Sequence, residues 1–298
     1  DVSMVWFWGK IYLRFASRPQ GGLPLVGSLL AKEQLGYLRG SFGRLVDGLV
    51  AACRSRGGAL TAGAPVEEVI VEDGRAVGVR LADGREDRAD AVLATTPSGL
   101  FRRIVPALDA MGDEGAQYAT MLDAVQYQWA TVLVLTLDRP LSDIYWLTMT
   151  DDDAPFVVAV EQTNFIPPAV YGGNHIVYFS DYMSPNDPMS QMSVEEILDL
   201  YEPWIRRINP DFDRSWIRGQ WVFRDRAGQP VVRVGYHEII PPHRTPIPGL
   251  YLANTTQIYP EDRGQNYSLR MGRRVASQVE SDGGARRPGG GRARYLPR

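Results

Sequence analysis

The sequence predicts a mixed α/β and antiparallel-β fold, in which a β-rich domain is inserted into an α/β domain. Three segments of the 298-residue chain support this prediction. Residues 36–105 show a helical period followed by short alternating strands, and residues 245–282 return to a strand and a helix. Between them, residues 106–244 are dominated by aromatic and β-branched residues, which are typical of antiparallel sheets. The length fits two ordinary domains.

The chain begins with segments of helical character. Residues 1–35 start with an aromatic-rich stretch and end in a Gly/Pro-rich connector, so we expect a helical segment that borders the β-rich domain. A second helix is predicted over about 42–56, where Leu45 and Leu49 recur at helical spacing and a Gly-Gly pair ends the pattern. Cys53 lies on the apolar side of this helix and is expected to be a small buried residue.

Two Asp-Gly pairs, ten residues apart, separate runs of β-branched residues after this helix. Asp-Gly favours tight hairpin turns. Three short antiparallel strands are therefore predicted near residues 66–72, 75–81 and 85–88. The next run, ADAVLATT, is almost continuously apolar, as in a strand buried within a sheet, and a helix is expected from Gly99 onward.

The β-rich segment is expected to form one broad antiparallel sheet, interrupted by the helix VEEILDLYEPWIRRI. Ser193 and Glu196 form a capping box at the start of this helix. The last ordered elements are a strand at Leu250–Ala253, a long loop and a helix from about Asn266. The tail, residues 283–298, is rich in Gly, Arg and Pro and is predicted to be disordered.

The charge distribution argues against nucleic-acid binding by the folded part. The formal net charge is −3, and the last sixteen residues hold five arginines and no acid, so the rest of the chain stands at −8. Such a body has no electrostatic basis for binding nucleic acid. The Arg-rich tail is interpreted as a disordered end rather than an RNA-binding arm.

Several other site classes are disfavoured by composition. The single cysteine excludes an internal disulfide framework, and the three histidines lack the spacing of a zinc site, so no metal centre is expected. No apolar run is long enough to span a bilayer, and no secretory signal is visible. We expect a cytoplasmic protein, for which peripheral membrane contact stays open.

Three motifs together carry a family resemblance. They are PVEEVIVEDGRAVGVRLADG…ADAVLATTP, GLYLANTTQIYPEDRGQNYSLRMGRRVA and GYLRGSFGRLVDGL. With them the chain resembles the flavin-containing amine oxidase superfamily over roughly residues 1–280, nearest its protoporphyrinogen-oxidase-like and nucleotide-sugar-mutase-like members. Each motif alone also fits an ordinary meander, strand–loop–helix or helix lead-in, and their agreement favours the family.

The resemblance implies the C-terminal part of a two-domain, Rossmann-like FAD-binding oxidoreductase with an inserted substrate domain. In relatives a first βαβ unit carries GxGxxG, which cradles the FAD diphosphate at a helix N-terminus. No GxGxxG follows a strand in this chain, and its first residue is Asp1. We therefore expect a piece of a longer product that lacks the first βαβ unit and does not hold FAD tightly by itself.

The resemblance also implies which residues bind FAD. The backbone of Val66 is expected to pair with the adenine, and Thr95 and Thr96 to lie near the diphosphate and ribose. Asn254 and Thr255 stand where relatives have Gly-Asp, whose carboxylate bonds the ribityl chain. The threonine offers a hydroxyl for the same bond, without charge.

After this strand, relatives place the N-terminus of a helix at the pyrimidine edge of the flavin. Unpaired amides at a helix start stabilise the negative charge of the reduced ring. The residues expected to supply them are Arg263, Gly264, Gln265, Asn266 and Tyr267. Further candidates near the isoalloxazine, from the third motif, are Tyr37, Arg39, Gly40 and Phe42.

The function implied by the resemblance is FAD-dependent removal of hydride from a hydrophobic or cyclic small molecule. A mutase acting on a nucleotide sugar is an alternative, in which Arg14, Arg18 and Arg244 are candidates for a diphosphate clamp. A flavin-free β-rich binding module is the alternative from another class.

The β-rich segment offers aromatic residues for a substrate cavity, although most are expected to belong to the core. They are Tyr145, Trp146, Tyr171, Tyr178 and Trp221. Glu161, Gln162 and Asn164 follow a hydrophobic strand and either face a cavity or cap the strand end. The sequence identifies no catalytic residue and no oligomeric state.

Overall fold

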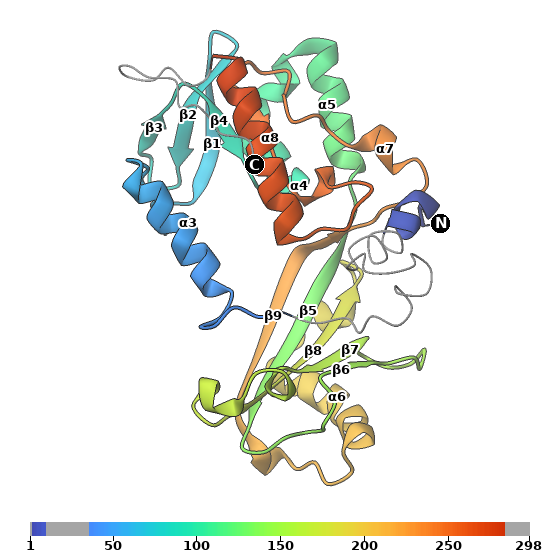
Figure 1. Ribbon diagram of the computed structural model, residues 1–298. Coiled ribbons are helices and arrows are strands. Elements are labelled where there is room, and N and C mark those ends of the chain that lie inside the picture. The colour runs from blue at the N-terminus through green and yellow to red at the C-terminus, as the bar shows by residue number, and fades with distance from the viewer. Residues whose placement is uncertain (1, 10–35, 284–298) are drawn as a thin grey trace, which may run out of the picture. The chain divides into compact units, whose positions relative to one another are not determined.

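The computed structural model describes residues 2–9 and 36–283, which form two compact units (Figure 1). The first unit is made of residues 1–125 and 232–298, and the second is Gln126–Val231. The second unit is thus a single insertion into the chain of the first.

Only a small part of the two terminal segments is described. Residues 10–35 and 284–298 lie outside the described residues, and with them most of the expected helical segment at 1–35 and the tail at 283–298. Residues 4–9 are helical, in agreement with the prediction for the start of the chain.

The first unit contains an antiparallel meander of β1 (Val66–Glu72), β2 (Arg75–Leu81) and β3 (Glu86–Arg88). The three predicted strands are therefore confirmed. Asp73 and Gly74 between β1 and β2 adopt φ angles of 49° and 73°. Two successive left-handed residues are what a two-residue type I′ hairpin requires, and Asp-Gly accepts this conformation at low cost.

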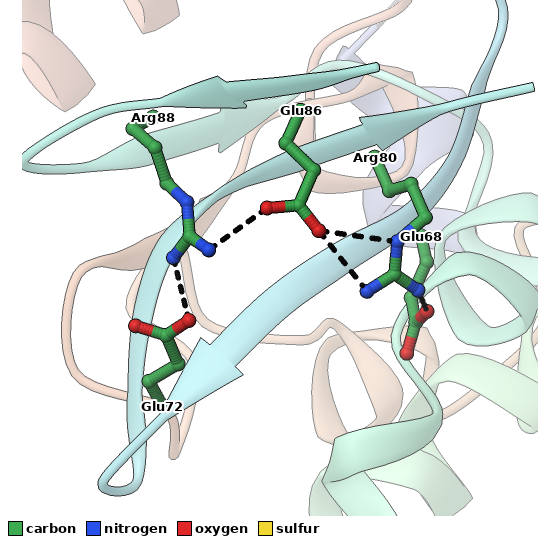
Figure 2. A network of polar contacts seen from close by, with 5 residues as sticks. All are labelled: Glu68, Glu72, Arg80, Glu86 and Arg88. Carbon is green, nitrogen blue, oxygen red and sulfur yellow. Dashed lines mark hydrogen bonds and ion pairs between the residues drawn. The ribbon is translucent and has the colours of Figure 1, made fainter. Parts of the chain in front are cut away.

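A row of alternating charges links the three strands of the meander (Figure 2). Arg88 contacts Glu72 at 2.6 Å and Glu86 at 2.8 Å. Arg80 contacts Glu68 at 2.5 Å and the other oxygen of Glu86 at 3.4 Å. All five side chains are at least one third exposed, so water and salt screen these pairs and each contributes little to stability.

A second, parallel sheet in the first unit joins two strands that lie far apart in the sequence. β4 (Val92–Ala94) pairs with β10 (Leu250–Leu252) over their full lengths. The expected strands at ADAVLATT and at Leu250–Ala253 are confirmed, with slightly shorter bounds. No third strand joins this pair among the described residues.

One face of the parallel pair packs on the helices that follow β4. They are α4 (Ser98–Ile104), the 3₁₀ helix Pro106–Ala110 and α5 (Gly112–Ala124). Phe101, Leu108 and Leu122 from these helices are buried together with Leu250 and Leu252. The opposite face carries α8 (Gln265–Ser281), whose Val275 is buried against Tyr251 and Ala253.

Residues 106–125 are helical and belong to the first unit, whereas the expected β-rich domain began at 106. Tyr118 and Leu122, four residues apart on α5, are both buried in the cluster that covers β4 and β10. The sequence analysis did not predict this helix, because its burial depends on β4 and β10, which lie far away in the sequence. Residues 232–244 also lie in the first unit.

α3 (Gly43–Ser55) occupies the span predicted from its leucine spacing. None of its residues is buried, since Leu45, Val46 and Leu49 line a groove instead of a packed core. The expectation that Cys53 is buried was therefore wrong, and its thiol is exposed.

The second unit is one antiparallel sheet with a helix on one face. In spatial order its strands are β6 (Trp146–Thr148), β7 (Val158–Glu161), β8 (His175–Met183), β5 (Tyr127–Leu137) and β9 (Ile217–Pro230). The predicted single broad sheet is confirmed.

The helix of this unit, α6 (Val194–Ile208), starts at the predicted capping box. Ser193 Oγ accepts a hydrogen bond from the amide of Glu196 at 3.2 Å, and the carboxylate of Glu196 accepts one from the amide of Ser193 at 2.7 Å. Ile197 and Tyr201 are buried against the leucines of β5. Shorter helices are α7 (Tyr236–Ile239) and the 3₁₀ turns Gln162–Asn164, Pro168–Tyr171, Pro188–Ser190, Arg214–Trp216 and Thr255–Gln257.

Candidate cofactor-binding site

The two parallel strands end at one edge of their sheet, and predicted site residues follow each of them. Thr95 and Thr96 come directly after β4, and Asn254 and Thr255 follow β10 after one residue. The side-chain amide of Asn254 donates to Thr96 O at 2.9 Å, which joins the two strand ends. In open parallel sheets, ligands bind outside the carboxyl ends of the strands. The structure thus places four of the predicted residues at an edge of this kind.

The side chain of Asn254 is directed into the protein. It is 6% exposed. Besides Thr96 it donates to Ser98 Oγ at 3.4 Å, and its Oδ1 accepts from the amide of Thr256 at 3.0 Å. Its backbone amide donates to Gln257 Oε1 at 2.9 Å. Asn254 therefore holds the turn after β10 against the start of α4 and positions its neighbours.

Other buried hydroxyl groups extend this arrangement. Ser98 Oγ and Thr256 Oγ1 lie 3.3 Å apart, and both residues are fully buried. Tyr236 of α7 donates its hydroxyl to Thr256 O at 3.0 Å. We call Asn254, Ser98, Thr256 and Gln257 the Asn254 cluster. Sequence reasoning missed Ser98 and Thr256, because nothing in the sequence shows that two residues 158 positions apart lie in contact.

One hydroxyl at this edge lacks a partner. Thr96 Oγ1 is buried and makes no hydrogen bond within the part of the chain that the structure describes. Thr95 is exposed and Thr255 is half-buried beside it. An unsatisfied buried hydroxyl costs about 1–3 kcal/mol, which a hydrogen-bonding ligand would offset. The edge therefore fits a ligand rich in hydroxyl or phosphate oxygens, such as the ribityl diphosphate of FAD.

The start of α8 lies beyond the same edge. At the other end of α8, Asp282 accepts a hydrogen bond from Tyr251 at 2.9 Å, close to the beginning of β10. Midway along, Val275 packs on Ala253 at the end of β10. α8 therefore runs antiparallel to β10, and its first turn extends past the carboxyl end of the strand.

The first turn of α8 suits an anionic ligand. Its N-cap residue, Gly264, provides no side-chain hydrogen bond, and its first turn contains no acid. Unpaired amides at a helix start carry partial positive charge. The predicted residues of this turn are Arg263, Gly264, Gln265, Asn266 and Tyr267. The backbone at Gly264 is extended, with φ of −173°, so its conformation does not by itself require glycine.

The other predicted contacts lie elsewhere in the first unit. Val66 opens β1 in the meander, where it pairs with Leu81. Tyr37 and Phe42 stack edge to face at 5.0 Å in the turn before α3. Arg39, in the same turn, accepts a hydrogen bond at its carbonyl from Arg44. The turn also contains Gly40, whose φ of 84° favours glycine. The described contacts do not join any of these residues to the Asn254 cluster.

The candidate arginines of a diphosphate clamp are not found at this edge. Arg244 forms a two-point ion pair with Asp282, with donor–acceptor distances of 2.6 and 3.0 Å. Its backbone also forms an isolated β-bridge with Tyr251, the central residue of β10. Arg14 and Arg18 lie outside the described residues.

The second unit presents an open aromatic face on its sheet. Opposite residues of antiparallel strands point to the same face. The register aligns one row across all five strands, from Trp221 through Val134, Tyr178 and Val160 to Trp146. Trp146 and Trp221 are 59% and 48% exposed.

The next row of this face runs from Phe223 through Val132, Ser180 and Val158 to Thr148. Neither row contains a charge, and five strands give a width of about 19 Å. The prediction that most of the aromatic candidates belong to the core was wrong. None of the five is buried. Trp146, Tyr178 and Trp221 lie on the sheet face that α6 does not cover, and Tyr145 and Tyr171 lie outside the strands. The sequence analysis missed Phe223, although its alternation with Trp221 was a usable signal.

Glu161 caps a loop and does not face a cavity. It is 2% exposed, and its two carboxylate oxygens accept hydrogen bonds from the amides of Leu141 and Ser142 at 2.9 and 2.7 Å. Burial raises the pKa of Glu161, and the hydrogen bonds from Ser142 and Leu141 oppose that shift. Asn164 donates to carbonyls of the same loop, and Gln162 to the hydroxyl of Tyr171. The segment was expected either to face a cavity or to cap the strand end, and these contacts favour the capping role.

Among residues 2–9 and 36–283, no group of three or more His, Cys, Asp or Glu side chains is placed to hold a metal ion. None of the described helices combines the length and the apolar composition needed to cross a bilayer.

The fold and the site together define the class of protein. A family profile described as flavin containing amine oxidoreductase matches residues 2–279. Because the match spans nearly the whole chain, the chain belongs to this family, in agreement with the resemblance seen in its motifs. The corresponding comparison with curated proteins gave no match.

Solved structures share the fold at low sequence identity. An oxidoreductase from Methanosarcina mazei aligns with a TM-score of 0.61 at 19% identity, covering 81% of this chain and 55% of its own. A protein assigned as a protoporphyrinogen oxidase, from Exiguobacterium sp. 255-15, gives 0.61 at 15% identity, covering 81% and 50%. A reduced UDP-galactopyranose mutase gives 0.53 at 17%, covering 68% and 43%. The chain thus spans about half the length of the solved structures it matches.

Proposed function

We propose that this chain forms the larger part of an FAD-dependent oxidoreductase that removes hydride from an apolar substrate. The observation that carries the proposal is the carboxyl edge of β4 and β10. There the Thr96 hydroxyl has no partner among the described residues, and the first turn of α8, which has no side-chain cap, lies beyond the edge. Family membership supports the cofactor, because the family is flavin-containing. FAD, when bound, supplies the hydride acceptor.

The residues of the edge divide into two roles in this proposal. Thr95, Thr96 and Thr255 hydrogen-bond the polar chain of FAD, and the amides at the start of α8 stabilise negative charge on it. The Asn254 cluster fixes the backbone on which these threonines stand. Val66, on the meander, is proposed to contact the adenine through its backbone.

The open face of the second unit supports the choice of substrate. In its two aligned rows of side chains, tryptophans lie on the two edge strands and valines lie between them. Neither row contains a charged residue. Aromatic side chains on such a surface favour flat apolar rings. The hydroxyls of Tyr178 and Ser180 are the polar groups available to orient a bound ring. We propose that a hydrophobic, cyclic molecule binds to this face.

A further βαβ unit, which the family resemblance implies and which residues 2–9 and 36–283 do not contain, is part of the proposal. The outer edge of β4 has no strand partner among the described residues, and Leu93 at its centre is 42% exposed. Parallel strands are normally covered on both faces. Between α3 and α8 lies an apolar groove of about 810 Å³. A strand beside β4 and a helix in this groove would complete the sheet, and without them we expect FAD to bind weakly.

A nucleotide-sugar mutase is the second candidate, since one similar fold is that of a UDP-galactopyranose mutase. The structure gives it less support, because Arg244 is paired with Asp282 away from the candidate site. Binding of a UDP-sugar to the reduced protein would favour it. A flavin-free binding module is the candidate if no FAD binds.

The test is a titration of the chain with FAD, followed by quenching of flavin fluorescence. Thr96→Val removes the unpartnered hydroxyl at nearly constant volume, and loss of one hydrogen bond should weaken binding roughly 3- to 10-fold. Thr120→Val is the matched control, because the Thr120 hydroxyl bonds within its own helix, α5. Equal FAD affinity in both variants, or no saturable quenching by the unmodified chain at high protein concentration, contradicts this assignment.

A further inference from the structure

A second hollow of the first unit lies on the outer side of β10 and is lined by basic and amide side chains. Its volume is about 500 Å³. The polar residues that line it are His237, His243, Arg244, Gln257, Arg274 and Gln278. Ile240, Pro241 and Pro242 form its apolar wall, and none of its lining residues is acidic. We call it the His243 hollow.

Two of these polar side chains are already engaged. Arg244 is neutralised by Asp282, with which it makes the two-point ion pair. Gln257 donates to Pro241 O and Leu252 O and accepts from the amide of Asn254. The charge of Arg244 is therefore offset, and both hydrogens of the Gln257 side-chain amide are in use.

The remaining groups are Arg274, Gln278 and His243. Arg274 is exposed, and within the described ranges 2–9 and 36–283 its side chain makes no ion pair and no hydrogen bond. Gln278, one turn further along α8, has a buried Oε1 without a partner in the same ranges. His243 is half-buried, and a 3.0 Å contact from its Nδ1 to Leu252 O fixes the ring.

The charges around His243 favour an added anion. Burial lowers the pKa of His243 and the positive charge of Arg274 adds to this shift, whereas hydrogen bonds with Leu252 and Gln257 oppose it. His237 is exposed, and its Nε2 lies 3.8 Å from the carboxylate of Glu238, which is also exposed. An anion beside Arg274 would compensate its charge. Because Nδ1–H of His243 donates to Leu252 O, the ring can donate to the anion only from Nε2 of the protonated imidazolium, a form that the negative charge of the anion would favour.

We propose that the His243 hollow binds an oxyanion, a phosphate group being the chemical match, with Arg274 as the main contact. His243 and Gln278 complete the site as hydrogen-bond partners. The amide of Gln278 donates if its end group turns by half a rotation, since its oxygen and nitrogen ends have nearly the same shape. The proposal goes beyond the flavin site and does not depend on it.

Hydrogen bonds link the hollow to the edge of β4 and β10 that is proposed to bind FAD. The imidazole of His243 and the amide of Gln257 both contact Leu252 O at the end of β10. Gln257 in turn belongs to the Asn254 cluster. An anion that restricts the motion of the His243 ring would therefore also restrict the turn after β10 that contains Thr255.

The experiment follows the histidine ring signals of the intact chain by NMR during titration with inorganic phosphate. The chain has three histidines, so His243→Gln assigns the signal. Arg274→Gln is the test variant, and Arg273→Gln is the matched control, because Arg273 is the preceding residue of α8 but lines the groove toward α3. Thermal unfolding of each variant verifies that it is folded.

A saturable shift of the His243 signal that weakens about tenfold or more in Arg274→Gln, but not in Arg273→Gln, supports the site. Tighter binding of ADP than of phosphate would assign the oxyanion to a nucleotide, and equal binding would assign it to a free anion. The proposal is overturned if the His243 signal does not saturate, if Arg274→Gln shifts like the unmodified chain, or if chloride at equal ionic strength has the same effect.

Discussion

Asn254 uses its amide group and its backbone to join β10, α4 and the turn between them, so its loss should affect stability as well as binding. Asn254→Ala leaves the buried hydroxyl of Ser98 and the amide of Thr256 with fewer partners. The expected loss of unfolding free energy is about 1–3 kcal/mol. Chemical denaturation measures it.

Comparing Asn254→Ala with Asn254→Asp separates the loss of the hydrogen bonds that position the turn from the effect of a new negative charge. Asn254→Asp keeps the acceptor for Thr256 but cannot donate to Thr96 O while ionised. We expect it to be less stable than the unmodified chain at neutral pH and to recover part of the loss when the new carboxyl is protonated. If Asn254→Ala were as stable as the unmodified chain, the positioning role would be wrong.

Glu161 should produce a pH-dependent contribution to the stability of the second unit. Burial raises its pKa above the unfolded value, so folding favours the protonated form. The stability from this group is fully present below the unfolded pKa and is lost as pH rises through the raised folded pKa. The unmodified chain should therefore lose this contribution over that window.

Glu161→Gln tests this prediction. It should remove the pH-dependent contribution and lower stability at every pH, because an amide cannot accept hydrogen bonds from both Leu141 N and Ser142 N. Denaturation curves between pH 4 and 8 measure both effects. Glu195→Gln, at an exposed position in α6, is the control. An unchanged pH profile in Glu161→Gln would show that Glu161 does not titrate in this range.

At the scale of single elements, the capping box of α6 gives a prediction of known size. Ser193→Ala removes the acceptor for the amide of Glu196 and should cost about 1 kcal/mol. Ser190→Ala is the matched control, because its hydroxyl makes only a 3.4 Å contact with Gln191. Thermal unfolding should separate the two variants, and equal midpoints would mean that tertiary packing holds the start of α6 without its cap.

The elements that sequence reasoning found are those whose signals are local. The hairpin at Asp73-Gly74 and the capping box at Ser193 need only neighbouring residues, and both form as predicted. α5 was missed because its burial depends on β4 and β10, which are distant in the sequence. Cys53 was placed wrongly for a related reason, since an apolar helix face predicts burial only when another element covers it.

The candidate site was also predicted only as far as local sequence signals allow. Thr96 and Asn254 were named from motifs, but the direction of each side chain depends on contacts across 158 residues of chain. Only the structure shows that the Asn254 amide turns inward and that the Thr96 hydroxyl has no described partner. The open aromatic face likewise depends on strand register, which five separate apolar runs do not specify.

At the scale of the whole molecule, the second unit is expected to fold by itself. Its two ends meet, since the amide of Val231 donates to Gln126 O at 2.9 Å and Tyr127 pairs with Pro230. Its core, between α6 and the sheet, is built from its own residues. Chains whose ends lie together can be excised or inserted as units.

An excised fragment, Gln126–Val231, should therefore unfold cooperatively and keep the open aromatic face. A flat apolar probe such as pyrene should bind to that face and quench its tryptophan fluorescence. Trp146→Ala and Trp221→Ala should each weaken probe binding several-fold, because an aromatic contact contributes about 0.5–1.5 kcal/mol beyond its area. Trp204→Ala, in α6 on the covered side of the sheet, is the comparison variant and should leave probe affinity unchanged even where it lowers stability. A fragment that folds but binds the probe equally well in all three variants would contradict the proposed substrate role of this face. The proposed FAD site at the edge of β4 and β10 would not be affected, because none of its residues lies in Gln126–Val231.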